Sequence, residues 1–110
     1  MFIKSQNGSL EYEGQFDNGL FDGEGVAKYS NRDVYKGEFS EGLKHGFGIY
    51  EYGNGDRYEG RFEYDKKNDR NGKILFGRSQ TVYEGGIREG KYHGSGKLSY
   101  PDGQYYEGFF

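Results

Sequence analysis

The sequence of 110 residues contains no cysteine, no tryptophan, one proline and one methionine. The absence of cysteine excludes disulfides, thiolate metal sites and cysteine nucleophiles. No apolar stretch reaches the roughly 18 residues of a membrane-spanning helix, and the N-terminal residues lack the apolar segment of a signal peptide. A single proline, without glycine at every third position, excludes a collagen-like chain. We expect one small domain in a soluble, cytoplasmic protein.

Aliphatic residues are scarce as well, because Leu, Ile, Val and Phe together make up 21 of the 110 residues. A share below about 20% is typical of disordered chains only when the net charge is also high, and here the net charge is −3. The sequence instead contains 12 Tyr, 9 Phe and 21 Gly. Disordered chains are poor in aromatic residues, and so much glycine disfavours a helical bundle. The composition therefore indicates an ordered chain built from aromatic rings and glycines.

A repeat organises these residues. The triplet Tyr-x-Gly begins at five tyrosines, and the spacings between them are 23, 23, 25 and 23 residues: Tyr12, Tyr35, Tyr58, Tyr83 and Tyr106. Gly-x-Gly follows 11 residues after the tyrosine in three of the units. The units run near 12–34, 35–57, 58–82 and 83–105, with partial units at both ends; we call the four complete ones units one to four.

Each unit is predicted to form two short strands. Alternate residues of a strand point to one face, so the pattern Tyr-x-Gly-x-Phe places Tyr35, Gly37 and Phe39 on the same face. A glycine inside a strand lets another group approach the backbone closely. We expect each glycine to leave a gap that a ring of a neighbouring strand fills. Asn18-Gly19 is a strong hairpin signal, and Asp65 takes the turn position in unit three. No segment has the apolar period of a helix, so the whole chain is predicted to be β.

The repeated unit Tyr-Glu-Gly-x-Phe-x-x-Gly-x-x-x-Gly-x-Gly-x-x-x-Tyr-x-x-Gly resembles the MORN (membrane occupation and recognition nexus) repeat, whose period is also 23. The best match runs from Tyr35 to Tyr58. The resemblance implies an all-β fold, an elongated twisted antiparallel sheet of stacked hairpins. It also implies a scaffold or binding module, of the kind found in cytoskeletal and ciliary assemblies and attached to some enzymes.

Unit three departs from this pattern. It has one extra residue before Gly72 and another in the turn between Gly77 and Val82, and Arg70 replaces the first Gly of Gly-x-Gly. We expect a bulge or a bend there. The segments Met1 to Lys4 and Tyr106 to Phe110 read as single strands of incomplete units. An uncapped end strand favours pairing with another chain, so we expect a fragment of a longer protein, self-association, or a partner at these ends.

Three features that could suggest a metal or catalytic site have structural explanations. His45 and His93 hold the same repeat position two units apart, about 19 Å from each other at two strands per unit, so we expect turn packing and no shared metal. The carboxylates on the face away from the rings are equivalent to one another, which favours solvated charge over catalysis: Glu13, Glu59, Glu84 and Glu107. The Gly-x-Gly motifs lack the helix and the Gly-Lys-Ser/Thr of phosphate loops. We therefore expect no enzyme activity, no cofactor, no metal and no nucleic-acid partner.

Two surfaces remain as candidates for binding. Rings that stay exposed on the aromatic face would form a groove for a protein partner, and the residues expected to do so are Tyr12, Tyr35, Tyr58 and Tyr83, followed by Tyr50 and Tyr52. A basic loop is the candidate for anionic lipid and peripheral membrane contact, and its residues are Lys66, Lys67, Arg70 and Lys73. The function expected first is a non-catalytic scaffold or adaptor in a cytoskeletal or ciliary assembly. The alternatives are a phosphoinositide-binding membrane tether and the regulatory part of a larger enzyme.

Overall fold

The structure, a computed structural model, describes residues 2–6 and 10–110. These residues form eleven strands in chain order: β1 (Phe2–Gln6), β2 (Leu10–Asp17), β3 (Leu20–Tyr29), β4 (Val34–Ser40), β5 (Leu43–Glu51), β6 (Arg57–Glu63), β7 (Lys66–Lys67), β8 (Asp69–Phe76), β9 (Thr81–Arg88), β10 (Lys91–Ser99) and β11 (Tyr105–Phe109). In the described ranges there is no helix, so none that could cross a membrane.

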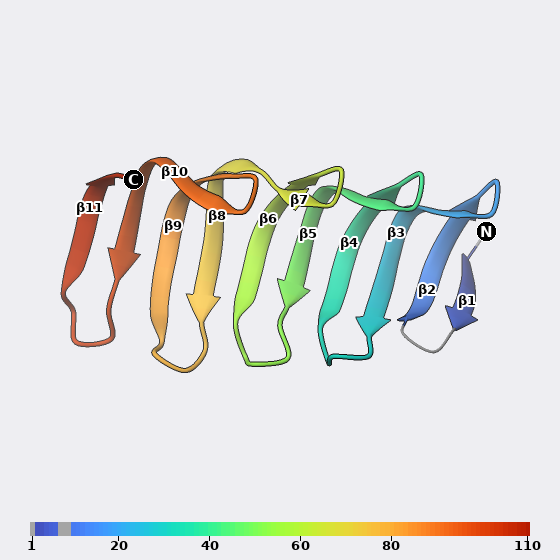
Figure 1. Cartoon of the computed structure of the whole chain (residues 1–110), viewed down its shortest axis with the longest axis horizontal. Coiled ribbons are helices and arrows are strands. Elements are labelled where there is room, and N and C mark those ends of the chain that lie inside the picture. Colours follow the sequence, from blue (N-terminus) through green and yellow to red (C-terminus); the bar gives the residue numbers. More distant parts are fainter. Residues whose placement is uncertain (1, 7–9) are drawn as a thin grey trace.

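The strands form one open antiparallel sheet in which each strand lies beside the next one along the chain (Figure 1). The short β7 is the exception, since it pairs with the end of β6 and lies off this path. The sheet is elongated, with extents of 47 × 24 × 17 Å. The predicted fold is therefore confirmed: successive hairpins stack side by side, and β1 and β11 lie at its two edges. Met1, the first residue of the predicted N-terminal strand, lies outside the described residues.

The hairpin turns within the units are two-residue turns with positive φ at both positions. In unit one these are Asn18 at 51° and Gly19 at 78°, and in unit three Tyr64 at 48° and Asp65 at 70°. Two left-handed residues make a type I′ turn, whose twist matches that of the flanking strands. The turn predicted at Asn18-Gly19 and the role of Asp65 are both confirmed.

The core is a row of side chains, most of them aromatic rings, on one face of the sheet, which we call the aromatic face. The tyrosine that begins each unit lies over glycines of its own and the following strand. A Cβ on Gly25 would lie within 3.0 Å of the Tyr12 ring, and the same holds for Gly48 under Tyr35. The phenylalanine of the next unit then packs edge-on between two tyrosines: Phe39 lies 5.2 Å from Tyr12 and 5.0 Å from Tyr35. The gap-and-ring packing expected from the sequence is thus present.

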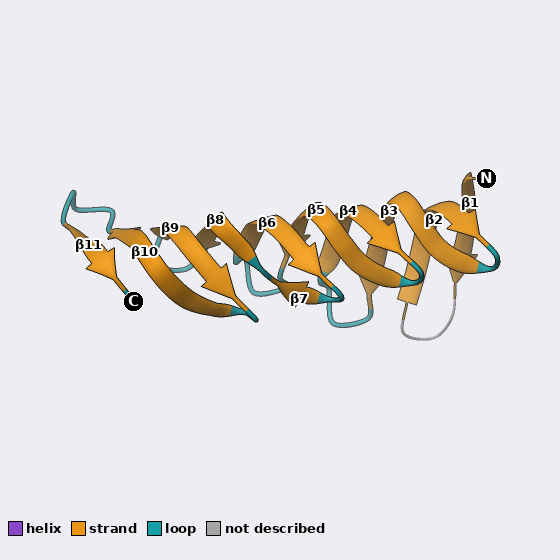
Figure 2. Cartoon of the chain, turned by 90° about the horizontal axis from the view of Figure 1, so that it is seen from above, coloured by secondary structure: helices purple, strands orange, loops and turns teal. Residues whose placement is uncertain are grey.

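Irregular pairing bends each hairpin. The register shifts between Gly14 and Phe16 in β2, and between Gly37 and Phe39 in β4. Bulges increase the local twist and bend of a strand, and Figure 2 shows the strand ends near the hairpin turns curving out of the plane of the sheet. The curved ends bring side chains that follow each turn over the aromatic face.

Unit three has the expected irregularity. Its second strand is divided into β7 and β8, and the register shifts between Asp69 and Gly72. The carboxylate of Asp69 accepts hydrogen bonds from the backbone N–H groups of Arg61 (2.8 Å) and Asn71 (2.9 Å), which holds the bulge. The extra residue before Gly72 is therefore absorbed without interrupting the sheet.

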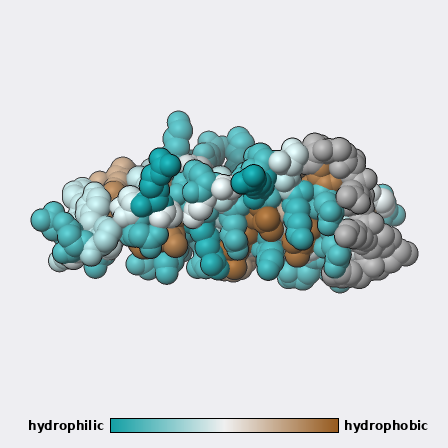
Figure 3. Space-filling view, turned by 90° about the horizontal axis from the view of Figure 1, so that it is seen from below, coloured by the Kyte–Doolittle hydropathy of each residue, from teal (hydrophilic) through white to brown (hydrophobic). Residues whose placement is uncertain are grey.

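We call the opposite face the back face. Figure 3 views the molecule from the edge formed by the turns between units, where hydrophilic residues predominate and hydrophobic ones are scattered among them. The carboxylates expected there alternate with lysines along one row of paired residues: Glu59, Lys73, Glu84, Lys97 and Glu107. Opposite charges on neighbouring strands contribute roughly 0.2–1 kcal/mol per pair. From β6 to β11 this row is thus a solvated surface of complementary charge, whereas between β3 and β5 it contains Val26 and Ile49, which both pair with Lys36.

Candidate binding cleft on the aromatic face

The first tyrosine of each unit is buried, and the expectation that these four rings stay exposed is wrong. Their side chains have a relative exposure of 0%. Each hydroxyl donates a hydrogen bond to the carbonyl three residues ahead; Tyr35 donates to Glu38 O at 2.8 Å and Tyr58 to Arg61 O at 2.7 Å. Burial raises the pKa of both phenols. These rings hold the sheet together.

Each buried tyrosine is covered by the side chain two residues beyond the hairpin turn. In units one and four this is a stacked ring: Phe21 lies 3.8 Å from Tyr12, and Tyr92 lies 4.1 Å from Tyr83. In units two and three the covering residues are Lys44 and Lys67, whose ammonium groups lie 5.8 Å from the centre of the Tyr35 ring and 5.7 Å from that of Tyr58. A lysine over a ring face makes a cation–π contact, so the middle of the aromatic face carries two positive charges.

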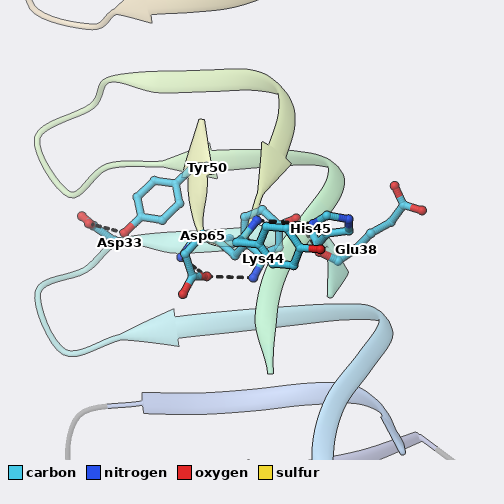
Figure 4. Close-up of polar contacts among 8 residues, drawn as sticks. Asp33, Glu38, Lys44, His45, Tyr50 and Asp65 are labelled. Atoms are coloured by element: carbon cyan, nitrogen blue, oxygen red, sulfur yellow. Dashed lines mark hydrogen bonds and ion pairs between the residues drawn. The ribbon is translucent and has the colours of Figure 1, made fainter. Parts of the chain in front are cut away.

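In unit two, Tyr50 and Lys44 each have a carboxylate partner (Figure 4). Tyr50 donates a hydrogen bond to the carboxylate of Asp33 at 2.7 Å, and the ammonium of Lys44 lies 3.4 Å from Asp65. Asp33 also accepts a hydrogen bond from Gly53 N at 2.8 Å. Burial alone would raise the pKa of Asp33, but these hydrogen bonds outweigh it and lower the pKa. The same burial and the Asp33 charge raise the pKa of Tyr50.

In unit three, the corresponding place is a cleft of about 440 Å³, which we call the Tyr58 cleft. Its apolar walls come from Tyr52, Tyr58, Ile74, Phe76 and Tyr92, and its polar lining from Asp56, Lys67 and Lys91. Lys67 extends across it, with its ammonium 4.5 Å from the centre of the Tyr52 ring. Burial, helped by the nearby charge of Lys44, lowers the pKa of Lys67. The volume lies within the roughly 300–1,000 Å³ typical of ligand pockets.

The cleft is open because Ile74 stands where unit two has the ring of Tyr50. Tyr50 pairs with Tyr35 across β4 and β5, and Ile74 pairs with Tyr58 across β6 and β8 in the same way. Tyr50 fills the space beside Lys44, with its ring 5.7 Å from that ammonium. The shorter Ile74 leaves the equivalent space beside Lys67 open.

Of the other predicted partner-binding rings, Tyr50 and Tyr52 are half-buried. Tyr50 occupies its place in unit two, and Tyr52 forms a wall of the Tyr58 cleft. The binding role of these two residues stays a prediction.

The predicted basic patch is divided between separate places. Lys67 lies on the aromatic face, whereas Lys73 lies on the back face, between Gly72 and Ile74 in β8. Lys66 is exposed and lies 3.6 Å from Glu89, and Arg70 is exposed beside the bulge of β8. Alternation along the strand separates these residues, although they are close in the sequence.

The predicted turn-packing role is confirmed for His45. Its Nδ1 accepts a hydrogen bond from Tyr64 N at 3.3 Å, and the two rings lie 4.7 Å apart. His93 is exposed, and its role in turn packing stays a prediction. Within residues 2–6 and 10–110, no group of three or more metal-ligating side chains is close enough to hold an ion.

Five side chains of the cleft were not predicted as site residues from the sequence: Asp56, Ile74, Phe76, Lys91 and Tyr92. Aligning the units with one another would have found two of them. The alignment places Ile74 where unit two has Tyr50, and Asp56 where unit one has Asp33. Such an alignment shows that Ile74 differs from its counterpart Tyr50 while Asp56 repeats Asp33.

The comparison with known families agrees with the fold. A sequence model of the MORN repeat matches residues 12–34, 35–57 and 83–105, which is more than half of the chain. The chain belongs to the MORN repeat family. MORN repeats are known from scaffold proteins that bind proteins or lipids, and the family is generally non-catalytic. The match leaves out 58–82, the unit that holds β7, the bulge and four of the side chains that line the Tyr58 cleft: Tyr58, Lys67, Ile74 and Phe76. A search of curated proteins finds no match to the chain.

Proposed function

We propose that this MORN repeat chain is a non-catalytic scaffold or adaptor that binds an extended segment of a protein partner along its aromatic face. The observation that carries this proposal is the Tyr58 cleft, which is open beside Lys67 where the Tyr50 ring fills the equivalent space beside Lys44. Aromatic residues are enriched at the centres of protein interfaces, and the cleft offers several of them at its walls.

The charges of the cleft favour a protein segment over an anionic head group. Lys67 and Lys91 present two ammonium groups, and Asp56 presents a carboxylate on the same lining. A phosphate placed between them would meet the repulsion of Asp56. A peptide supplies apolar side chains together with both donors and acceptors, which matches this mixture.

Selection from a displayed library of random peptides tests the proposal. Binders are expected to shift the backbone amide signals of Tyr52, Ile74 and Tyr92 in heteronuclear NMR spectra. Residues of the back face, such as Lys36 and Lys97, serve as internal controls and should not shift. Selected peptides that map to the back face, or a selection that yields no binder, would contradict the proposal.

Membrane binding is a second candidate function, supported by the family resemblance and by the exposed Lys66. It is tested by sedimentation with vesicles of phosphatidylcholine and phosphatidylserine. A role for the basic loop predicts that Lys66→Glu combined with Lys67→Glu reduces sedimentation, and unchanged sedimentation counts against it. A place in a cytoskeletal or ciliary assembly, a role as part of a larger enzyme, and association through the edge strands stay predictions.

A further inference from the structure

Unit two shows how the space beside a covering lysine is filled by a phenol. The Tyr50 ring lies 6.1 Å from Tyr29 and 4.6 Å from Tyr52. The Lys44 ammonium lies 5.7 Å from its centre. Its hydroxyl donates to Asp33 at 2.7 Å. The phenol is thus held by rings, by a cation and by a carboxylate.

The Tyr58 cleft repeats these surroundings one unit later. Tyr52 takes the place of Tyr29, and Phe76 takes that of Tyr52. Asp56 and Lys67 take the places of Asp33 and Lys44. The ring itself is what changes, because Ile74 occupies the position of Tyr50.

The hydrogen bonds of the two aspartates differ by one donor. Asp33 accepts from Asn31 Nδ2 at 3.2 Å, from Gly53 N at 2.8 Å and from the Tyr50 hydroxyl. Asp56 accepts the same first two bonds, from Asn54 Nδ2 at 3.3 Å and from Gly77 N at 2.9 Å. Among the described residues, no hydroxyl donates to Asp56, since Ile74 has none to give.

Lys67 differs from Lys44 in a similar way. Lys44 pairs with Asp65, whereas the ammonium of Lys67 makes no ion pair within the part of the chain that the structure describes. Its ammonium instead lies over the rings of Tyr52 and Tyr58. A further ring beside Lys67 would add a cation–π contact like the one between Lys44 and Tyr50.

We propose that the Tyr58 cleft binds a tyrosine side chain of the partner, in the place that Tyr50 takes in unit two. This inference rests on the proposed function and names the side chain that anchors the partner. The phenol ring lies between Tyr52 and Phe76 beside Lys67, and its hydroxyl donates a hydrogen bond to Asp56. A carboxylate side chain would be repelled by Asp56, and a phenylalanine would fill the cleft without the hydrogen bond.

The first test compares two small probes, N-acetyl-tyrosinamide and N-acetyl-phenylalaninamide, by NMR titration of the full chain. Both present the same backbone and differ by the hydroxyl. The tyrosine derivative is expected to bind at least about tenfold more tightly, the effect of a hydrogen bond to a charged group. It should shift the amide signals of Asp56 and Gly77. Asp56→Asn is expected to reduce the difference between the two probes.

The second test fills the cleft from within. Ile74→Tyr introduces the missing phenol and is expected to abolish binding of N-acetyl-tyrosinamide, with a melting temperature equal to or above that of the parent chain. Leu98→Tyr is the matched control, because Leu98 pairs with Tyr83 in unit four as Ile74 does with Tyr58. It should leave binding unchanged.

Two results would overturn the inference: equal affinity for the two probes, or undiminished binding to a folded Ile74→Tyr variant. Neither would overturn the proposed function, because peptides from the library could still occupy the cleft through apolar contacts. If selected peptides map elsewhere while the tyrosine probe binds in the cleft, the proposed function fails and the phenol site remains.

Discussion

Gly96→Ala tests whether the glycines of this sheet are required by the rings above them. Gly96 lies in β10, where it pairs with Gly85 and Gly108. An added Cβ would lie 2.5 Å from Oη and 2.8 Å from Cε1 and Cζ of Tyr83. The Tyr83 ring cannot move away from this Cβ, because Tyr92 stacks on it at a centroid distance of 4.1 Å.

The magnitude follows from two opposing effects. Alanine is normally more stable than glycine within a strand by roughly 0.5–1 kcal/mol, and overpacking a filled core costs about 1–3 kcal/mol. Displacing the ring would also weaken the 2.7 Å hydrogen bond from Tyr83 to Gly86 O, with a net value of about 1 kcal/mol. We expect the free energy of unfolding to fall by about 1–2 kcal/mol and the melting temperature by at least about 4 °C.

Urea and thermal unfolding followed by circular dichroism measure this effect. Ser95→Ala is the matched control, because Ser95 is the preceding residue of the same strand, is exposed and faces the other side; it should change stability by less than about 0.5 kcal/mol. Combining Gly96→Ala with Tyr83→Leu should cost less than the two single changes added together. A Gly96→Ala variant as stable as the parent chain would refute the packing argument.

Three other changes probe the ring row, the buried phenols and a turn. Phe62→Ala removes the ring that lies 5.1 Å from Tyr35 and 5.2 Å from Tyr58, and should lower the free energy of unfolding by about 3–5 kcal/mol in urea; a loss below about 1 kcal/mol would contradict its place in the core. Because the folded state raises the pKa of Tyr35, Tyr50 and Tyr58, the stability they contribute is complete below about pH 10 and is lost as the pH rises above it. These three buried phenols should therefore ionise only when the chain unfolds at alkaline pH, so part of the rise in tyrosinate absorbance should coincide with unfolding. If all tyrosines ionise in one step before the chain unfolds, this expectation is wrong. Asp65→Ala should lower the free energy of unfolding by about 1–2 kcal/mol, because φ is 70° at this position. Asp65→Gly should lower it by less, and thermal melts that rank the two variants in the opposite order would count against the turn assignment.

The repeat in the sequence was sufficient to predict the sheet, the hairpins and the residues that share a face. The pattern Tyr-x-Gly-x-Phe placed Tyr35, Gly37 and Phe39 together because strand alternation is a local property. Whether Tyr35 is exposed depends on the bend of the hairpin, which places Lys44 over its ring. That bend arises from a bulge between Gly37 and Phe39, and the repeat pattern alone does not reveal it.

The basic loop shows a second limit of the same reasoning. Lys67 and Lys73 are close in the sequence, but the bulge of β8 and strand alternation place them on opposite faces. The position of the cleft could have been predicted from the sequence, because Ile74 stands where unit two has Tyr50. Sequence alone does not show that the surroundings of Tyr50 are repeated around Ile74. The hydrogen bonds of Asp56, which match those of Asp33, show it.

The most direct test is a crystal structure of the chain with the tightest peptide selected from the library. We predict that the peptide lies along the aromatic face with a tyrosine in the Tyr58 cleft and its hydroxyl within hydrogen-bonding distance of Asp56. A peptide bound to the back face, or one that leaves the cleft between Tyr52 and Phe76 open, would contradict the proposed binding mode.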